Sequence, residues 1–143
     1  FSGTDLSEID LRYSDLRYTI LDGTDLQDSL LFGTRFCNAS MKGADLRYSL
    51  IHESDFTGAD LSGAKFTATE ARAGVPGYNK WIVTGYQRVS FRGANLSGAD
   101  FLRSSIRDAD FTGAVMDGAV FQRGQLPQYN LSPEQLQVIN IFG

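Results

Sequence analysis

Cys37 and His52 are the residues best suited to nucleophilic catalysis, because a thiol or hydroxyl needs a neighbouring base to become a strong nucleophile. The 143-residue chain contains only one residue of each of these two types. In the repeat described below, the two residues fall on adjacent walls and point outward in roughly perpendicular directions, too far apart for a hydrogen bond. We therefore expect no catalytic pair, and we expect His52 to be a solvated side chain rather than a metal ligand.

Asp5, Asp25 and Asp45 recur every twenty residues, and a stack of such side chains would have a spacing of about 5 Å, similar to the paired carboxylates of retaining glycosidases. A convex wall offers no water-excluding cleft, however, and Asp at a bend commonly binds nearby backbone groups. The Gly-rich stretch 93–98 has the spacing of a repeat corner, not that of a phosphate-binding loop. The sequence thus predicts a protein that is not an enzyme and that has no catalytic, metal or cofactor site.

A large apolar residue occupies every fifth position over most of the chain. A small residue often precedes this centre by two places, and Gly often follows it by two. A period of five suits neither an amphipathic helix nor a flat strand, so the repeat must itself be the structural unit. The centres are Phe1, Leu6, Leu11, Leu16, Leu21, Leu26, Leu31, Phe36, Met41, Leu46, Ile51, Phe56, Leu61 and Phe66, and then Phe91, Leu96, Phe101, Ile106, Phe111, Met116 and Phe121.

The order of residues within each unit is a small residue, Asp or Asn, Leu or Phe, a polar residue and often Gly. Residues 44–46 (Ala-Asp-Leu) and 94–96 (Ala-Asn-Leu) are examples. This pattern resembles the pentapeptide-repeat family over residues 1–66 and about 89–126. The resemblance implies an all-β fold, a right-handed quadrilateral β-helix with four pentapeptides per coil, as a single domain over residues 1–143.

In that geometry, residues twenty positions apart stack on the same wall, which assigns a core. A count of twenty residues per coil places Phe91 on the third wall with Leu11, Leu31 and Ile51. The same count places Leu96 on the fourth wall. The expected core stack is Leu21, Leu26, Phe36, Leu46, Phe56, Leu61, Phe66, Phe91, Leu96, Phe101, Phe111 and Phe121. A single coil buries too little apolar surface to offset its ordering entropy, so the coils need neighbours and caps.

Residues 69–88 interrupt the pattern between N-terminal coils (1–68) and C-terminal coils (89–126). Two interpretations fit this segment: an irregular coil with Trp81 and Tyr86 in the core, or a loop that leaves the rod. The poor wall residues Ala71 and Pro76 favour a loop that returns near Trp81. A long loop in a regular scaffold often carries function.

Near the C-terminus, residues 132–135 (Ser-Pro-Glu-Gln) combine an N-cap, a proline at the first helical position and a capping-box glutamine. They predict a capping helix over 132–141, whose apolar side would cover the open strands of the last coil. The N-terminal end is expected to be exposed, and a homodimer through an exposed end of the solenoid is a further expectation. Because the chain starts at Phe1 within a repeat, we expect that it is processed or trimmed.

The formal charge is −4, from 13 basic and 17 acidic residues. This charge disfavours direct binding of nucleic acid. No apolar run reaches transmembrane length and no charged leader is present, so we expect no membrane association and a soluble protein. The family resemblance leaves the compartment open among the cytoplasm, the thylakoid lumen and the periplasm.

The surface suggests a protein partner of unidentified kind. The count places an apolar and basic strip on the outside of the third wall, and exposed apolar patches often mark interaction sites. The candidate partner-binding residues are Leu30, Phe32, Leu50, His52 and Arg92, with Tyr78 and Lys80 from the interruption. We expect a non-enzymatic interaction or structural scaffold. The alternative comes from resemblance to the quinolone-resistance group of the family: a DNA mimic that binds a type II topoisomerase.

Overall fold

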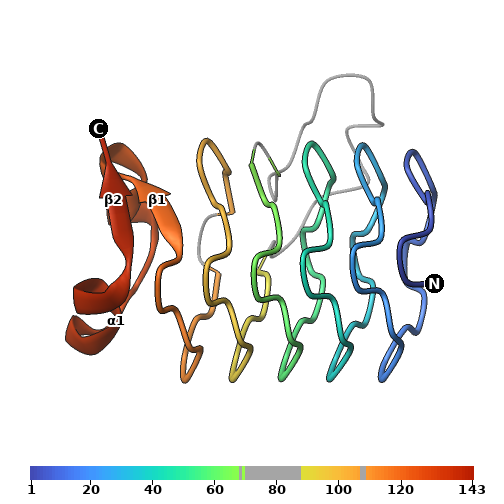
Figure 1. Ribbon diagram of the computed structural model, residues 1–143, viewed down its shortest axis with the longest axis horizontal. Coiled ribbons are helices and arrows are strands. Elements are labelled where there is room, and N and C mark those ends of the chain that lie inside the picture. The colour runs from blue at the N-terminus through green and yellow to red at the C-terminus, as the bar shows by residue number, and fades with distance from the viewer. Residues whose placement is uncertain (68, 70–87, 107–108) are drawn as a thin grey trace.

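The chain winds into a rod of stacked coils that is closed at its C-terminal end by a small capping structure (Figure 1). The computed structural model describes residues 1–67, 69, 88–106 and 109–143. The large apolar residues point into the rod, and the twelve residues expected in the core stack are each at most 1% exposed.

Parallel backbone pairing joins each coil to the next. Asp5 pairs with Asp25, and Asp25 pairs in turn with Asp45. Around Asp25, the Leu6 amide donates to the Asp25 carbonyl at 2.8 Å, and the Asp25 amide donates to the Thr4 carbonyl at 2.9 Å. Because corners follow one another every five residues, most walls contribute only an isolated parallel bridge. The rod is therefore a β-helix with little regular strand.

The four walls of the rod are defined by their inward centres. Wall 1 consists of Phe1, Leu21, Met41, Leu61, Leu96 and Met116, and wall 2 of Leu6, Leu26, Leu46, Phe66, Phe101 and Phe121. Wall 3, in its described part, consists of Leu11, Leu31, Ile51 and Ile106, and wall 4 of Leu16, Phe36, Phe56, Phe91 and Phe111. The names wall 1 to wall 4 are used in this sense below.

The pairing across the interruption corrects the wall assignment made from sequence. Phe91 stacks on Phe56 of wall 4, with ring centroids 5.2 Å apart and planes 8° apart, and does not join Ile51 on wall 3. The bridges 55–90, 60–95 and 65–100 all span 35 residues instead of 20. The difference of 15 residues equals three pentapeptides, so the period of five survives. Each later unit, however, lies on the wall that follows the one expected from a 20-residue count. Ala71, Pro76, Trp81 and Tyr86 lie outside the described residues.

Phenylalanine rings fill the second half of the rod in two interlocking columns. On wall 4, Phe36, Phe56, Phe91 and Phe111 stack at centroid distances of 5.0 to 5.2 Å. Phe101 of wall 2 meets Phe91 and Phe111 edge to face, both at 5.8 Å. Offset-stacked and edge-to-face pairs each add about 0.5–1.5 kcal/mol beyond area burial.

The described corner residues from Gly3 to Gly118, each two places after a centre, have a left-handed backbone conformation. Glycine is the residue that adopts it at least cost, and the corner between walls 1 and 2 is glycine at all six described levels. These glycines are Gly3, Gly23, Gly43, Gly63, Gly98 and Gly118, with φ between 64° and 72°. Gly33, at another corner, also gives room to Tyr13, because a Cβ there would lie 2.3 Å from the ring.

The C-terminal cap contains strand β1 (Val120–Gln122), the 3-10 helix η1 (Arg123–Gln128), helix α1 (Pro133–Val138) and strand β2 (Asn140–Phe142). β2 pairs in parallel with β1. Helix α1 is shorter than the expected range 132–141, because Ile139 is extended and the chain continues as β2. None of its residues is buried, so the expectation that its apolar side covers the last coil is wrong.

Two glutamine side chains cap the last coil instead. The Gln125 amide nitrogen donates to the carbonyls of Phe101 and Ser104, both at 2.9 Å, while its oxygen accepts from the Gln122 amide at 2.7 Å. Gln135 repeats the arrangement, donating to the carbonyls of Phe111 at 2.8 Å and Ala114 at 3.2 Å. Each side chain replaces the amide groups that a further coil would supply, and so removes an unpaired strand edge.

The substitution Gln125→Glu should destabilise the protein by about 2–4 kcal/mol, since it sets carboxylate oxygens against two buried carbonyls and removes their donor. Gln137→Glu, on the exposed side of α1, is the matched control and should change stability by less than about 0.5 kcal/mol. Urea unfolding monitored by circular dichroism measures both. Equal stabilities of the two variants would refute the capping role.

Candidate interaction surfaces

The described residues contain no catalytic pair. Cys37 lies half-buried on wall 4, where its Sγ contacts the Asp55 carbonyl oxygen at 3.9 Å, and burial raises the pKa of its thiol. His52 lies on wall 3 and has no hydrogen-bonding partner among the described residues. Within the described ranges, no group of three or more His, Cys, Asp or Glu residues could hold a metal ion.

The strip expected on the third wall is not an exposed surface. Phe32, Leu50 and His52 are only 2%, 6% and 3% exposed, and Leu30 is half-buried. Outward side chains on successive coils lie about 5 Å apart and so cover one another. For these residues, the expectation of an exposed patch is wrong.

The remaining candidate residues do not join that strip. Arg92 is exposed, but the 35-residue step places it on wall 4 instead of wall 3. Its guanidinium pairs with Asp110 at 3.0 Å. Tyr78 and Lys80 lie outside the described residues. Of the described candidates, the structure therefore brings Leu30, Phe32, Leu50 and His52 together on wall 3 and separates Arg92 from them.

The wall aspartates act on their own backbone. Asp5 and Asp45 each accept a hydrogen bond from the amide two residues ahead, at 3.0 and 3.2 Å. Hydrogen bonds from Ser7 lower the pKa of Asp5. Burial would raise the pKa of Asp45, but hydrogen bonds from Arg47 outweigh it and lower the pKa. The twenty-residue Asp stack is present as the sequence predicts, and it serves turn formation.

The charges are divided unequally between the two halves of the rod's circumference. Walls 1 and 2 display seven described carboxylates and three cations on their outer side, a balance of 3 − 7 = −4. These residues are Asp22, Asp60, Asp117, Asp5, Asp25, Asp45 and Asp100, with Lys42, Arg47 and Lys65. We call this surface the acidic face. The described outer residues of walls 3 and 4 balance, with Asp10, Asp15, Asp55 and Asp110 against Arg12, Arg17, Arg35 and Arg92.

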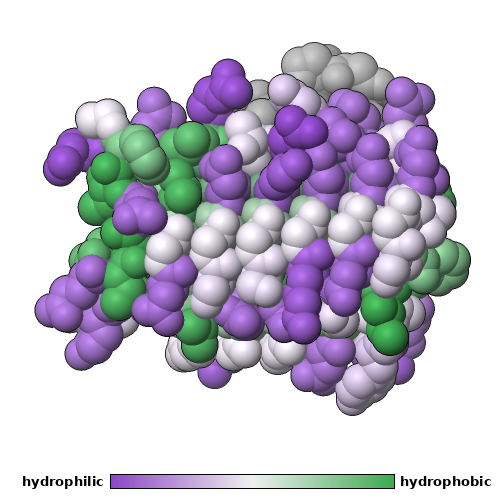
Figure 2. All heavy atoms as spheres, in the orientation of Figure 1, coloured by the Kyte–Doolittle hydropathy of each residue, from purple (hydrophilic) through white to green (hydrophobic). Residues whose placement is uncertain are grey.

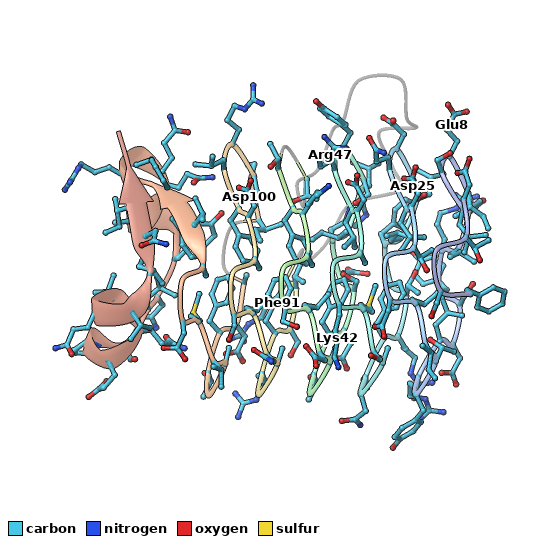
Figure 3. All side chains as sticks on the ribbon, in the orientation of Figure 1. Glu8, Asp25, Lys42, Arg47, Phe91 and Asp100 are labelled. Carbon is cyan, nitrogen blue, oxygen red and sulfur yellow. The ribbon has the colours of Figure 1, made fainter. Side chains whose placement is uncertain are left out.

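The acidic face runs along the length of the rod. Asp25, Arg47 and Asp100 lie along one side in successive parts of the solenoid, with Lys42 below them (Figure 3). The described corner residues between walls 1 and 2 are all glycine, so no side chain projects from this corner. Sequence reasoning missed this face because Asp100 joins the stack of Asp5, Asp25, Asp45 and Lys65 only through the 35-residue step, which no local pattern reveals.

Exposed apolar side chains gather at the ends of the rod. Figure 2 shows hydrophilic and neutral residues over most of the viewed surface, with apolar residues concentrated at the C-terminal end. There Leu136, Val138, Ile141 and Phe142 are 37–55% exposed. The homodimer through an end of the solenoid stays a prediction. None of the described helices has the length and hydropathy needed to cross a membrane.

Comparison with known proteins agrees with this architecture. A family model described as pentapeptide repeats matches residues 1–28, 29–67 and 87–123, with eight copies. No curated protein matches the chain. The crystal structure of a pentapeptide repeat protein, Rfr23, from the cyanobacterium Cyanothece 51142 is 18% identical, with a TM-score of 0.71 over 84% of this chain and 86% of that one.

Two further solved structures are similar at lower scores. A pentapeptide repeat protein from the thylakoid lumen of Arabidopsis thaliana is 26% identical, with a TM-score of 0.44 over 93% of this chain and 72% of that one. QnrB1, a plasmid-mediated fluoroquinolone resistance protein, is 14% identical, with a TM-score of 0.45 over 100% of this chain and 89% of that one. The structural likeness to Rfr23 shows a shared solenoid fold and nothing further about function.

Proposed function

Because the chain belongs to the pentapeptide-repeat family, whose fold presents flat walls and no deep cleft, we propose that it is a non-enzymatic scaffold that binds another protein through its acidic face. The observation that carries this proposal is the separation of charge around the rod. The acidic face has a balance of −4, while the described outer residues of walls 3 and 4 balance to zero.

The backbone hydrogen bonds hold the carboxylates of the acidic face in place. Asp5, Asp25 and Asp100 each accept a hydrogen bond from the amide two residues ahead, at 2.9 to 3.0 Å. Their positions are therefore set before a partner arrives, which reduces the entropy lost on binding. Fixed carboxylates that outnumber the cations along this face favour a partner whose surface is rich in Lys and Arg.

The expected contacts are individually weak. Exposed ion pairs typically contribute about 0.2–1 kcal/mol each, and salt screens them over about 8 Å at physiological ionic strength. A useful affinity thus requires several carboxylates to act together along the rod. Such an interface gains mainly in association rate and in discrimination against acidic partners.

A second candidate rests on the same row of carboxylates. Their spacing along a narrow rod also suits the cationic groove in which a DNA-binding enzyme holds its substrate, so the protein would act as a DNA mimic toward a type II topoisomerase. In a supercoiling assay with and without a fluoroquinolone, this candidate requires a change in activity or drug sensitivity that depends on the acidic face. A general scaffold requires neither.

Neutralising the acidic face should weaken binding of a basic probe. The triple variant Asp5→Asn, Asp25→Asn and Asp100→Asn keeps the oxygen that accepts each turn hydrogen bond but removes three charges. We expect its affinity for a decalysine peptide, measured by calorimetry in about 20 mM salt, to fall at least tenfold, since each lost ion pair costs about 0.5 kcal/mol or more at low ionic strength.

The matched control removes the same number of charges from walls 3 and 4. Asp10, Asp15 and Asp55 also accept hydrogen bonds from the amide two residues ahead, so their replacement by Asn perturbs equivalent turns. This control should lose less than about threefold in affinity. If both triple variants lose affinity equally, net charge alone governs binding and the acidic face is not the interaction surface.

A further inference from the structure

His52 is at an outward position of wall 3 and yet belongs to a buried stack. Its imidazole lies 4.3 Å from the Phe32 ring at an angle of 12°. The edge of Tyr13 meets Phe32 at 5.9 Å, and the Arg12 guanidinium carbon lies 5.4 Å from the Phe32 ring centroid. The imidazole thus extends an aromatic stack on the outside of the solenoid core.

Both imidazole nitrogens are buried, and neither has a hydrogen-bonding partner in the described part of the chain. Buried polar atoms in folded proteins nearly always have a partner, and a buried charge without one is far more costly than a neutral group. Burial accordingly lowers the pKa of His52 from 6.5 to about 4. The stack accommodates the neutral ring and disfavours the protonated one.

Among the described residues, the charged groups around this stack offer no ready counterion. In the described part of wall 3 the charged side chains are Asp10 and Arg12, which pair with each other at 2.7 Å. Glu53 follows His52 in the chain and is exposed at the corner. A protonated imidazole would therefore share its stack with the Arg12 cation, and the Asp10 carboxylate is already engaged.

We propose that protonation of His52 opens wall 3 locally: the imidazolium leaves the Phe32 stack for water, and the ring face of Phe32 that His52 covers becomes exposed. The protein then presents an apolar surface in mildly acidic solution that it covers at neutral pH. This device lies on wall 3 and is independent of the acidic face on walls 1 and 2.

The direction of the pH effect follows from proton linkage. Above pH 6.5 the ring is neutral in both the closed and the open state, so the equilibrium does not depend on pH. Between pH 6.5 and about 4 the open state binds the proton more tightly, and opening becomes easier as the pH falls. At pH 5 the opening constant should exceed its value at pH 7.5 by about 30-fold.

The test uses the fact that His52 is the only histidine in the chain. Its single set of imidazole proton resonances in an NMR titration reports its pKa directly. Amide hydrogen exchange at pH 7.5 and 5, corrected for intrinsic rates, reports opening. The reporters on wall 3 are the amides of Leu31 and Gly33, which donate to the carbonyls of Leu50 and His52 at 2.8 and 3.0 Å.

The Gly43 amide, which donates to the Ser62 carbonyl at 2.8 Å between walls 1 and 2, is the internal reference. We expect protection at Leu31 and Gly33 to fall about 30-fold in the wild type, and protection at Gly43 to stay constant. His52→Phe preserves the stacked ring without a titratable group and should abolish the fall. Tyr48→Phe, at an exposed corner, should retain it.

Three results would overturn the proposal. The first is a His52 pKa at or above its ordinary 6.5, which would place the ring in water. The second is an equal fall in protection in wild type and His52→Phe, and the third is an equal fall at Gly43, which would indicate global unfolding.

Discussion

Parallel hydrogen bonding between successive coils is the constraint on which the rest of the molecule depends. A wall contributes only one bridging residue per coil, so no single wall would hold a sheet together. Four walls per coil, repeated through four to six described levels each, give a ladder along the rod. Because pairing fixes which residues lie side by side, the apolar core, the row of carboxylates and the buried outer stack all follow from the register.

The period of five could be predicted from the sequence because it is a local property that each unit repeats. It identified the buried centres, the glycine corners and the stacking of Asp5, Asp25 and Asp45. It could not fix which wall follows the interruption, because an insertion of any whole number of pentapeptides preserves the same period. Phe91 therefore has the same sequence pattern whether it packs on Ile51 or, as in the structure, on Phe56.

The outer surface was predicted less well because the inward and outward alternation does not describe contacts between neighbouring coils. Phe32 and His52 occupy outward positions and are nevertheless buried against each other. At the C-terminus, local signals correctly marked the start of a helix at Ser132, but sealing of the coil depends on Gln125 and Gln135. These side chains act on residues more than twenty positions away, and no local pattern reveals such contacts.

The register also links structure to proposed function. The 35-residue step places Asp100 next to Lys65 in the stack of wall 2, and moves Arg92 to wall 4. With a 20-residue count instead, Asp117 would lie on wall 4 rather than wall 1, and the exposed Arg92 would lie on wall 3. The distribution of charge around the rod is therefore a consequence of how many pentapeptides the interruption contains.

Disulfide formation between Asp60→Cys and Asn95→Cys, in a Cys37→Ser background, tests this register most directly. Residues 60 and 95 are bridge partners, and a spacing of about 5 Å between adjacent strands suits a disulfide. Our account predicts an intrachain disulfide under mild oxidation, detected by peptide mass mapping. The pair Ser40→Cys and Asn95→Cys, two levels apart and about 10 Å distant, should form none. Absence of the 60–95 disulfide, or equal cross-linking of both pairs, would contradict the 35-residue step and the surfaces derived from it.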